Sequence, residues 1–180
     1  MTVSSTGIPG LLILQPRVFT DARGSFVKTY HSQIFQDAGI SFVPAEEFFS
    51  ISRKGVIRGM HFQLPPAAHD KLVFCTAGRV IDVVLDLRTS LPTFGRSFSC
   101  ELSAAHRQMM FIPAGLAHGF LSLEDDSTIF YQTSTIHSPA HDVGILWNSF
   151  GFDWPVQEPV LSERDRGFAG WTDFRSPFSA

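Results

Sequence analysis

The sequence predicts an all-β fold, a small antiparallel jelly roll or barrel with a few short helices. Short segments rich in Val, Ile, Phe and Thr recur along the chain, and turns that contain Pro or Gly separate them. Helical periodicity is confined to short windows, which excludes a helical bundle. The expected strands include residues 10–14, 25–30, 72–76, 80–87, 108–112 and 128–133. The mouth of such a barrel is a natural ligand site.

Two short helices are expected among these strands. Residues 32–38 read as a helix that Gly39 ends. Ser162, with Asp165 three residues later, resembles a helix N-cap with acidic support, so a turn or two should follow it.

Residues 80–87 alternate strictly between two faces of the expected strand. One face is apolar and should pack in the core: Ile81, Val83, Leu85 and Leu87. The other face carries Asp82 and Asp86, which are either solvated or turned into a polar cavity. We expect solvation, because carboxylates are seldom fully buried, although Asp82 could instead pair with Lys71.

Composition and charge limit the partners. The 180 residues carry a formal charge of −3, which argues against nucleic acid or an anionic membrane as the partner. An anionic ligand would therefore need a local cluster of arginines. No apolar run is long enough to span a membrane, and the start lacks the pattern of a signal peptide. We expect a single domain, residues 1–180, in the cytoplasm.

Two polar clusters stand out from apolar surroundings. The first is Arg-Gly-Met-His-Phe-Gln at 58–63, in which a regular strand would send Arg58 and His61 to opposite faces. Gly59 between them could host a β-bulge that turns both side chains into one cavity. In the second cluster, Ile-Pro-Ala-Gly-Leu-Ala-His-Gly-Phe at 112–120, a turn delivers His118 into a strand.

The second cluster resembles the second metal motif of cupin proteins, which also have a jelly-roll barrel. The first cupin motif supplies a His-x-His pair and a downstream Glu, whereas His61 is followed here by Phe62 and Gln63. The next histidine is His69. We therefore expect no metal ion. A metal-dependent cupin oxygenase stays the alternative, which the metal content of the purified protein would identify.

Four more motifs complete an ordered set: Lys-Leu-Val at 71–73, Asp-Val-Val-Leu-Asp-Leu-Arg at 82–88, Ser-Leu-Pro-Thr-Phe-Gly at 90–95 and Leu-Ser-Glu-Arg-Asp at 161–165. With the two clusters, this order resembles the dTDP-4-dehydrorhamnose 3,5-epimerase family over most of the chain. The resemblance implies a cupin-like jelly roll and a homodimer. It also implies a cofactor-free isomerase of deoxysugar biosynthesis that inverts C3, C5 or both in a nucleotide-linked 4-keto-6-deoxyhexose.

The resemblance also assigns roles to residues. His61 matches the base that removes a proton beside the ketone, and Asp165 matches the carboxylate that orients it. Tyr131 matches the acid on the opposite face of the sugar, and Lys71 the cation near the enolate oxygen. The residues expected to bind substrate are Arg23, Glu47, Arg58, His118, Asp142 and Arg164. Arg23 belongs to a segment that is expected to reach the partner's site.

Departures from the family pattern fall where the family binds the nucleotide and the sugar. They are Lys28 in place of Glu, Glu46-Glu47-Phe48 in place of Gln-Asp-Asn, and His137 near an expected tyrosine. We therefore expect the same reaction type, with the nucleotide and the sugar left open. A single-site epimerase or ketoisomerase would share this pattern. A further alternative is a non-catalytic sensor of sugar nucleotides. Such a protein would need the arginines but would have no use for the acid–base residues.

Overall fold

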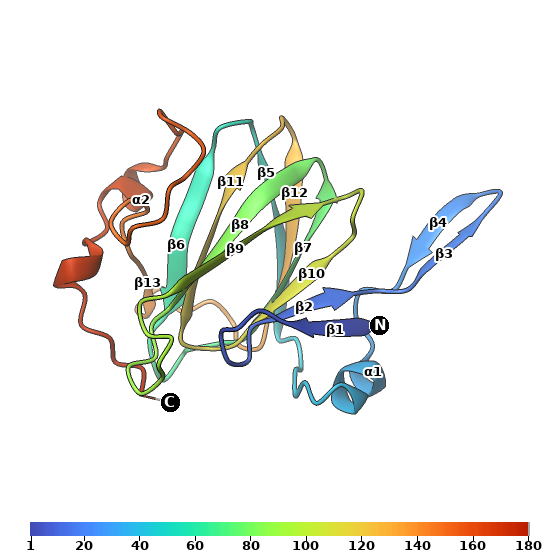
Figure 1. The fold of residues 1–180 in the computed structure, drawn as a ribbon, viewed down its shortest axis with the longest axis horizontal. Coiled ribbons are helices and arrows are strands. Elements are labelled where there is room, and N and C mark those ends of the chain that lie inside the picture. Colours follow the sequence, from blue (N-terminus) through green and yellow to red (C-terminus); the bar gives the residue numbers. More distant parts are fainter. Residues whose placement is uncertain (180) are drawn as a thin grey trace.

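The computed structural model describes residues 1–179 and consists mainly of two antiparallel sheets that face each other (Figure 1). Strands account for 42% of the chain and helices for 7%. The prediction of an all-β fold with a few short helices is therefore confirmed.

One sheet has six strands and the other has five. The larger sheet has the order β1 (Thr2–Ser5), β2 (Leu12–Gln15), β10 (Met109–Ile112), β7 (Lys71–Ala77), β12 (Ser127–Thr133) and β5 (Glu46–Ser52). The smaller sheet has the order β13 (Asp142–Gly144), β6 (Ile57–Gln63), β11 (Leu116–Ser122), β8 (Arg79–Asp86) and β9 (Ser97–Ser103). Side chains of both sheets meet between them in one apolar core, which is the interior of the barrel.

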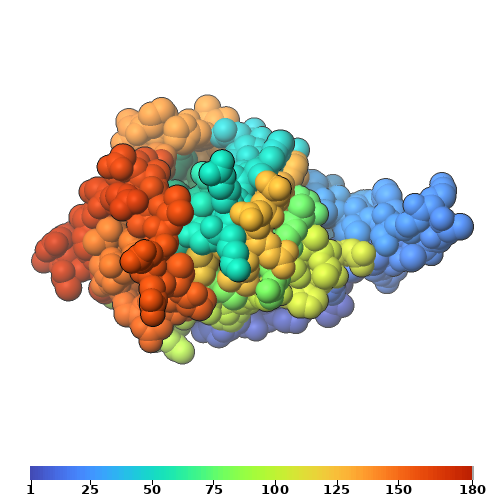
Figure 2. Space-filling model, turned by 90° about the horizontal axis from the view of Figure 1, so that it is seen from above, coloured from blue at the N-terminus to red at the C-terminus, as the bar shows by residue number. Residues whose placement is uncertain are grey.

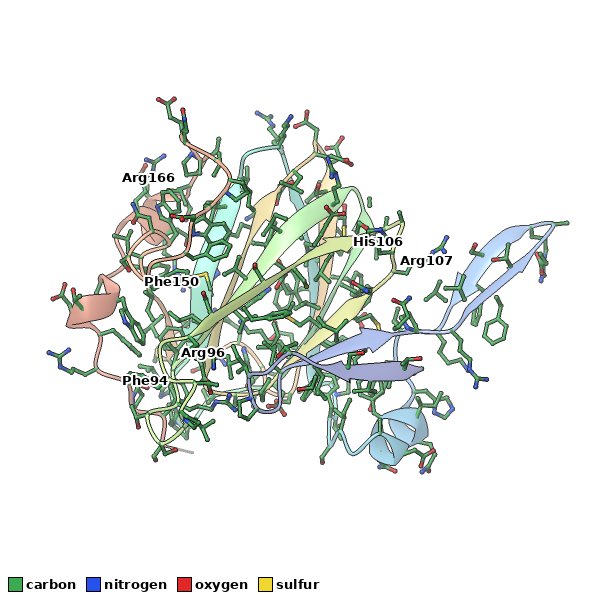
Figure 3. The ribbon with its side chains drawn as sticks, viewed as in Figure 1. Phe94, Arg96, His106, Arg107, Phe150 and Arg166 are labelled. Carbon is green, nitrogen blue, oxygen red and sulfur yellow. The ribbon has the colours of Figure 1, made fainter. Side chains whose placement is uncertain are left out.

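The strands β3 (Val18–Asp21) and β4 (Gly24–Val27) form a separate hairpin, here called the arm, that projects from the barrel (Figures 1 and 2). Figure 3 shows its side chains standing clear of the barrel, on the side where His106 and Arg107 lie between β9 and β10. The arm's second strand is shorter than predicted, because the chain leaves it after Val27 to enter the first helix.

Both predicted helices are present. The first, α1 (Ser32–Asp37), ends just before Gly39, whose φ of +75° suits the left-handed turn after a helix. The second, α2 (Glu163–Arg166), begins after Ser162, and the Ser162 Oγ accepts a hydrogen bond from the Asp165 N–H at 3.1 Å. A 3₁₀ turn, η1 (Trp171–Asp173), follows near the end of the chain. In the part of the chain described, the helices are too short or too polar to cross a membrane.

The prediction that the carboxylates of β8 are solvated is wrong. Asp82 and Asp86 are both fully buried. The apolar face of β8 packs as expected, but under the C-terminal segment, while the face with the carboxylates lines the interior between the sheets. Buried carboxylates need hydrogen bonds, and Asp86 accepts them from Arg88 and Thr93. Asp82 pairs with His118 rather than with Lys71.

A β-bulge interrupts the pairing of β6 with β11, as the glycine at position 59 predicted. His61 pairs with His118 and Arg58 with Phe120, so two residues of β6 oppose the single residue Gly119. Gly59 has a φ of +132°, and a Cβ there would lie 2.6 Å from the Gly119 Cα. Only glycine permits this close approach of the two strands. The bulge directs Arg58 and His61 to the same cavity.

Candidate active site

A cavity of about 290 Å³ opens between the two sheets, and side chains from both form its walls. It brings together these residues that the sequence predicted for the site: Arg58, His61, Lys71, His118, Tyr131, Asp142 and Arg164. Such a concave site with convergent polar groups inside an apolar barrel is the usual form of a small-molecule site.

His61 on β6 is oriented by Asp165 on α2. The His61 Nε2 lies 2.8 Å from the Asp165 Oδ1, and the Gly59 N–H donates to the Asp165 Oδ2 at 3.2 Å. Burial opposes ionisation of Asp165, but the hydrogen bonds from His61, Gly59 and Ser162 outweigh it and hold the carboxyl pKa below its usual value. A carboxylate only accepts, so the His61 Nε2 carries the hydrogen and Nδ1 is left to take up a proton.

Tyr131 stands on β12, in the sheet that faces His61. Its side chain is only 8% exposed, and its hydroxyl lies 3.2 Å from the Ser50 Oγ. The Phe48 ring stacks on it with 4.8 Å between centroids. Burial raises the pKa of Tyr131, so the phenol keeps its proton at neutral pH.

Lys71 begins β7, the strand that neighbours Tyr131's strand. Its Nζ donates to the His61 backbone oxygen at 3.3 Å, so the amine lies beside the histidine's strand. Burial lowers the pKa of Lys71 to about 8, against the opposing charges of Asp142 and Asp82. A cationic amine in so dry a place interacts strongly with any negative charge that develops near it.

His118 forms a second histidine–carboxylate pair beside the first. It lies opposite His61 in the strand register, and its Nε2 is 2.8 Å from the Asp82 Oδ2. His118 is 4% exposed, whereas the side chain of His61 is 30% exposed. His61 is thus the more accessible of the two to a ligand. Within residues 1–179, no three His, Cys, Asp or Glu side chains are grouped so that they could hold a metal ion.

The cavity wall carries an ion pair with a histidine beside it, and a second arginine. The Arg164 Nη2 lies 2.8 Å from the Asp142 Oδ2, and the His137 Nε2 lies 3.1 Å from the same oxygen. Burial opposes ionisation of Asp142, but the hydrogen bonds from Arg164 and His137 lower its pKa. Arg58 donates to the Ser52 Oγ at 3.0 Å. Both arginines line the cavity, where guanidinium groups can bind an anionic ligand.

Three predicted site residues lie elsewhere. Asp165 stands behind His61 and does not line the cavity. Glu47 is on the face of β5 turned away from it, where Glu47 accepts a hydrogen bond from Gln132 at 2.6 Å. The side chain of Arg23 is 90% exposed on the arm and pairs there with Asp21. In this chain alone, Arg23 is not part of the cavity.

Several lining residues were not among the predicted site residues: Glu46, Phe48, Ser50, Gln63, His69, Thr133 and His137. In the sequence, Glu46, Phe48 and His137 stood out only as departures from the family pattern. Glu46, Phe48 and Ser50 come from β5. They are every second residue of that strand and so share one face, which is the signal that the sequence offered. His69 follows the first polar cluster in the sequence and was given no role there. Its Nδ1 accepts from the Gln63 amide at 3.1 Å, and burial lowers its pKa to about 3, so it is neutral.

Comparison with known proteins agrees with this geometry. The family model described as dTDP-4-dehydrorhamnose 3,5-epimerase matches residues 5–173. The chain belongs to this family. The membership predicted from the ordered motifs is therefore confirmed, and with it the assignment to the nucleotide-sugar epimerases, which are isomerases.

The relatives cover nearly the whole chain. A dTDP-4-dehydrorhamnose 3,5-epimerase from Shigella flexneri is 43% identical over 170 residues, which are 92% of this chain and 93% of the relative. The solved dTDP-6-deoxy-D-glucose-3,5-epimerase from Legionella pneumophila, in complex with dTDP-4-keto-L-rhamnose, has a TM-score of 0.92 at 31% identity, with coverage of 97% and 94%. A 3'-monoepimerase from Streptomyces bikiniensis, in complex with dTDP-quinovose, has a TM-score of 0.86 at 32% identity, with coverage of 91% and 85%. The predicted cupin-like jelly roll is confirmed by these likenesses.

Proposed function

We propose that this epimerase inverts carbons next to the ketone of a dTDP-linked 4-keto-6-deoxyhexose, with His61 as base and Tyr131 as acid. The observation that carries the proposal is their placement on the two facing sheets, with the cavity between them. Inversion requires a proton to leave one face of a carbon and another to arrive on the opposite face. Groups on opposite walls meet that requirement.

The chemistry follows from the ketone at C4. It acidifies the hydrogens on C3 and C5, so the His61 Nδ1 can remove one and leave an enolate. Asp165 stabilises the resulting imidazolium, and the buried ammonium of Lys71 stabilises the enolate oxygen. The Tyr131 hydroxyl then protonates the same carbon from the other side. Each step uses only side chains of this protein.

The two arginines fit the anionic part of the substrate. Planar guanidinium groups form paired hydrogen bonds with phosphate oxygens, and Arg58 and Arg164 stand at the cavity near His61. A nucleotide diphosphate would extend from the cavity past these residues. Because a doubly charged diphosphate does not cross membranes unaided, we propose that the enzyme works in the cytoplasm.

We also propose that the protein is a homodimer. The arm exposes Phe19 and Phe26, at 57% and 60%, and the outer face of β5 exposes Phe49 and Ile51. Apolar side chains exposed in this way mark an interaction surface. A second copy of the chain would cover them and would bring the partner's arm, with its arginine, to the cavity.

Deuterium incorporation tests the acid and the base separately. The His61→Ala variant should lose exchange of substrate hydrogens with D₂O by about a hundredfold to ten-thousandfold, because the base is gone. Tyr131→Phe should keep exchange but fail to invert, since His61 returns the proton to the face it came from. Proton NMR of the C3 and C5 signals measures both rates. Tyr30→Phe is the control, because the Tyr30 hydroxyl bonds to the Phe42 carbonyl.

Substrates linked to dTDP, CDP and GDP extend that experiment to the ligand. We expect the fastest exchange with dTDP, and deuterium at C3, C5 or both. Label at one carbon alone would identify a single-site epimerase, as the Streptomyces relative is described. Normal inversion by Tyr131→Phe would show that the acid is wrongly assigned, and no exchange with any 4-keto sugar would overturn the proposed function.

The pH dependence tests the role of Lys71. Its amine is charged below its pKa of about 8 and neutral above it, so stabilisation of the enolate should be lost as the pH rises through 8. The kcat/KM of the wild type should therefore fall on the alkaline side near pH 8. In the Lys71→Arg variant, the remaining kcat/KM should not fall near pH 8, because arginine stays charged. A wild-type profile that is flat to pH 10 would contradict this role.

Light scattering tests the dimer. The predicted mass is about 40 kDa, twice the 20.0 kDa of one chain. Arg23→Ala should keep this mass and raise KM, because the arginine is exposed within its own chain. A mass of one chain at micromolar concentration would contradict both the dimer and a role for Arg23.

A further inference from the structure

The Tyr131 hydroxyl has a protein partner that the mechanism above does not use. Its oxygen lies 3.2 Å from the Ser50 Oγ, the one hydrogen-bond partner found for it among residues 1–179. The Phe48 ring stacks on the phenol with an interplanar angle of 16°, and the His118 ring meets it edge-on at 6.2 Å. The phenol is thus held in one position, with Ser50 at its polar end.

Strand β5 places Ser50 beside the phenol, on the wall of the same cavity. It is the edge strand of its sheet, and Phe48 and Ser50 lie on its inner face. The register pairs Tyr131 with Phe48, which makes Ser50 the diagonal neighbour of Tyr131. Tyr131 is nearly buried, whereas Ser50 is half-buried and lines the cavity. Tyr131 lines the cavity too, so the Ser50 hydroxyl bonds to the phenol and reaches the cavity from a more exposed position.

Proton donation leaves Tyr131 in a state that the surroundings disfavour. The phenolic O–H bond breaks as the C–H bond of the product forms, and a phenolate remains. Burial raises the pKa of Tyr131 because the charged form is poorly solvated there, although Arg58 favours it. The phenolate needs a donor at once and a new proton before the next turnover.

A serine hydroxyl can meet both needs, because it donates and accepts hydrogen bonds at the same time. The Ser50 O–H can donate to the phenolate oxygen and pass its proton there while a water molecule in the cavity gives a proton to the Ser50 oxygen, so that no serine alkoxide forms. The hydroxide left by the water takes up the proton that His61 releases. The protons balance over the cycle, since solvent supplies the proton that enters the product and receives the one that His61 removed.

We propose that Ser50 is a positioning residue for Tyr131, which aims the phenol at the second face of the sugar and carries its replacement proton from solvent. The proposal rests on the proposed function, because it requires Tyr131 to be the acid. It adds the route by which the Tyr131 phenolate regains its proton after each turnover.

The test compares inversion with exchange in the same sample. The fraction of exchange events that end in inversion does not depend on how much of a variant is folded. In D₂O, Ser50→Ala should exchange at close to the wild-type rate, because His61 is untouched, while inversion falls about tenfold or more. Ser50→Thr keeps the hydroxyl on a strand and should restore most of the inversion. Ser99→Ala, at an exposed position on the edge strand β9, is the matched control.

The outcomes separate this inference from the proposed function. If Tyr131→Phe loses inversion and Ser50→Ala keeps the wild-type fraction, Tyr131 is the acid and the role of Ser50 is wrong. Equal loss of exchange and inversion in Ser50→Ala would also overturn it, since that pattern indicates a general disturbance of the site. If Tyr131→Phe inverts normally, the assignment of the acid fails and the role of Ser50 fails with it.

Discussion

The close approach of Gly59 to Gly119 is the constraint on which the rest of the site depends. It allows two residues of β6 to face one of β11, and this shift in register turns Arg58 and His61 into the same cavity. It also leaves the Gly59 N–H free of the strand pairing, so that it can donate to Asp165. The carboxylate then bonds to His61 as well, and the N-cap of Ser162 fixes the short helix that carries it. One backbone contact therefore positions the base, its orienting carboxylate and an arginine.

The barrel keeps several ionisable groups in its dry interior by giving each a partner. His118 and Asp82 satisfy each other, Asp165 is bonded to His61, and the Lys71 amine is bonded to a backbone oxygen. Burial that would be costly for isolated charges is tolerable for paired ones, and it strengthens their interaction with charge that develops during the reaction. The proposed base comes from the smaller sheet and the proposed acid from the larger one, so the two groups face each other across the cavity.

Much of the fold and the centre of the site could be predicted from the sequence, since they depend on local signals. Glycine at position 59 indicated the bulge, and Ser162 indicated the helix that carries Asp165. The burial of Asp82 could not be predicted, because it depends on His118 in a strand distant in sequence. β5 was missed although its alternation was visible, because its side chains mix charge with aromatic rings. Glu47 was placed by resemblance alone, and the period of two along β5 turns it away from the cavity. The proposed contact of Arg23 is with the cavity of a second chain, and the sequence of one chain does not show where that second chain lies.

The central claim is that one carbon of the sugar lies between a base on one sheet and an acid on the other. A crystal structure of the protein with a dTDP-linked 4-keto-6-deoxyhexose, or an unreactive analogue, tests it most directly. The account predicts C3 or C5 within about 3.5 Å of the His61 Nδ1, with the Tyr131 hydroxyl on the opposite face of the ring. A sugar with both side chains on the same face, or one bound outside the cavity, would contradict it.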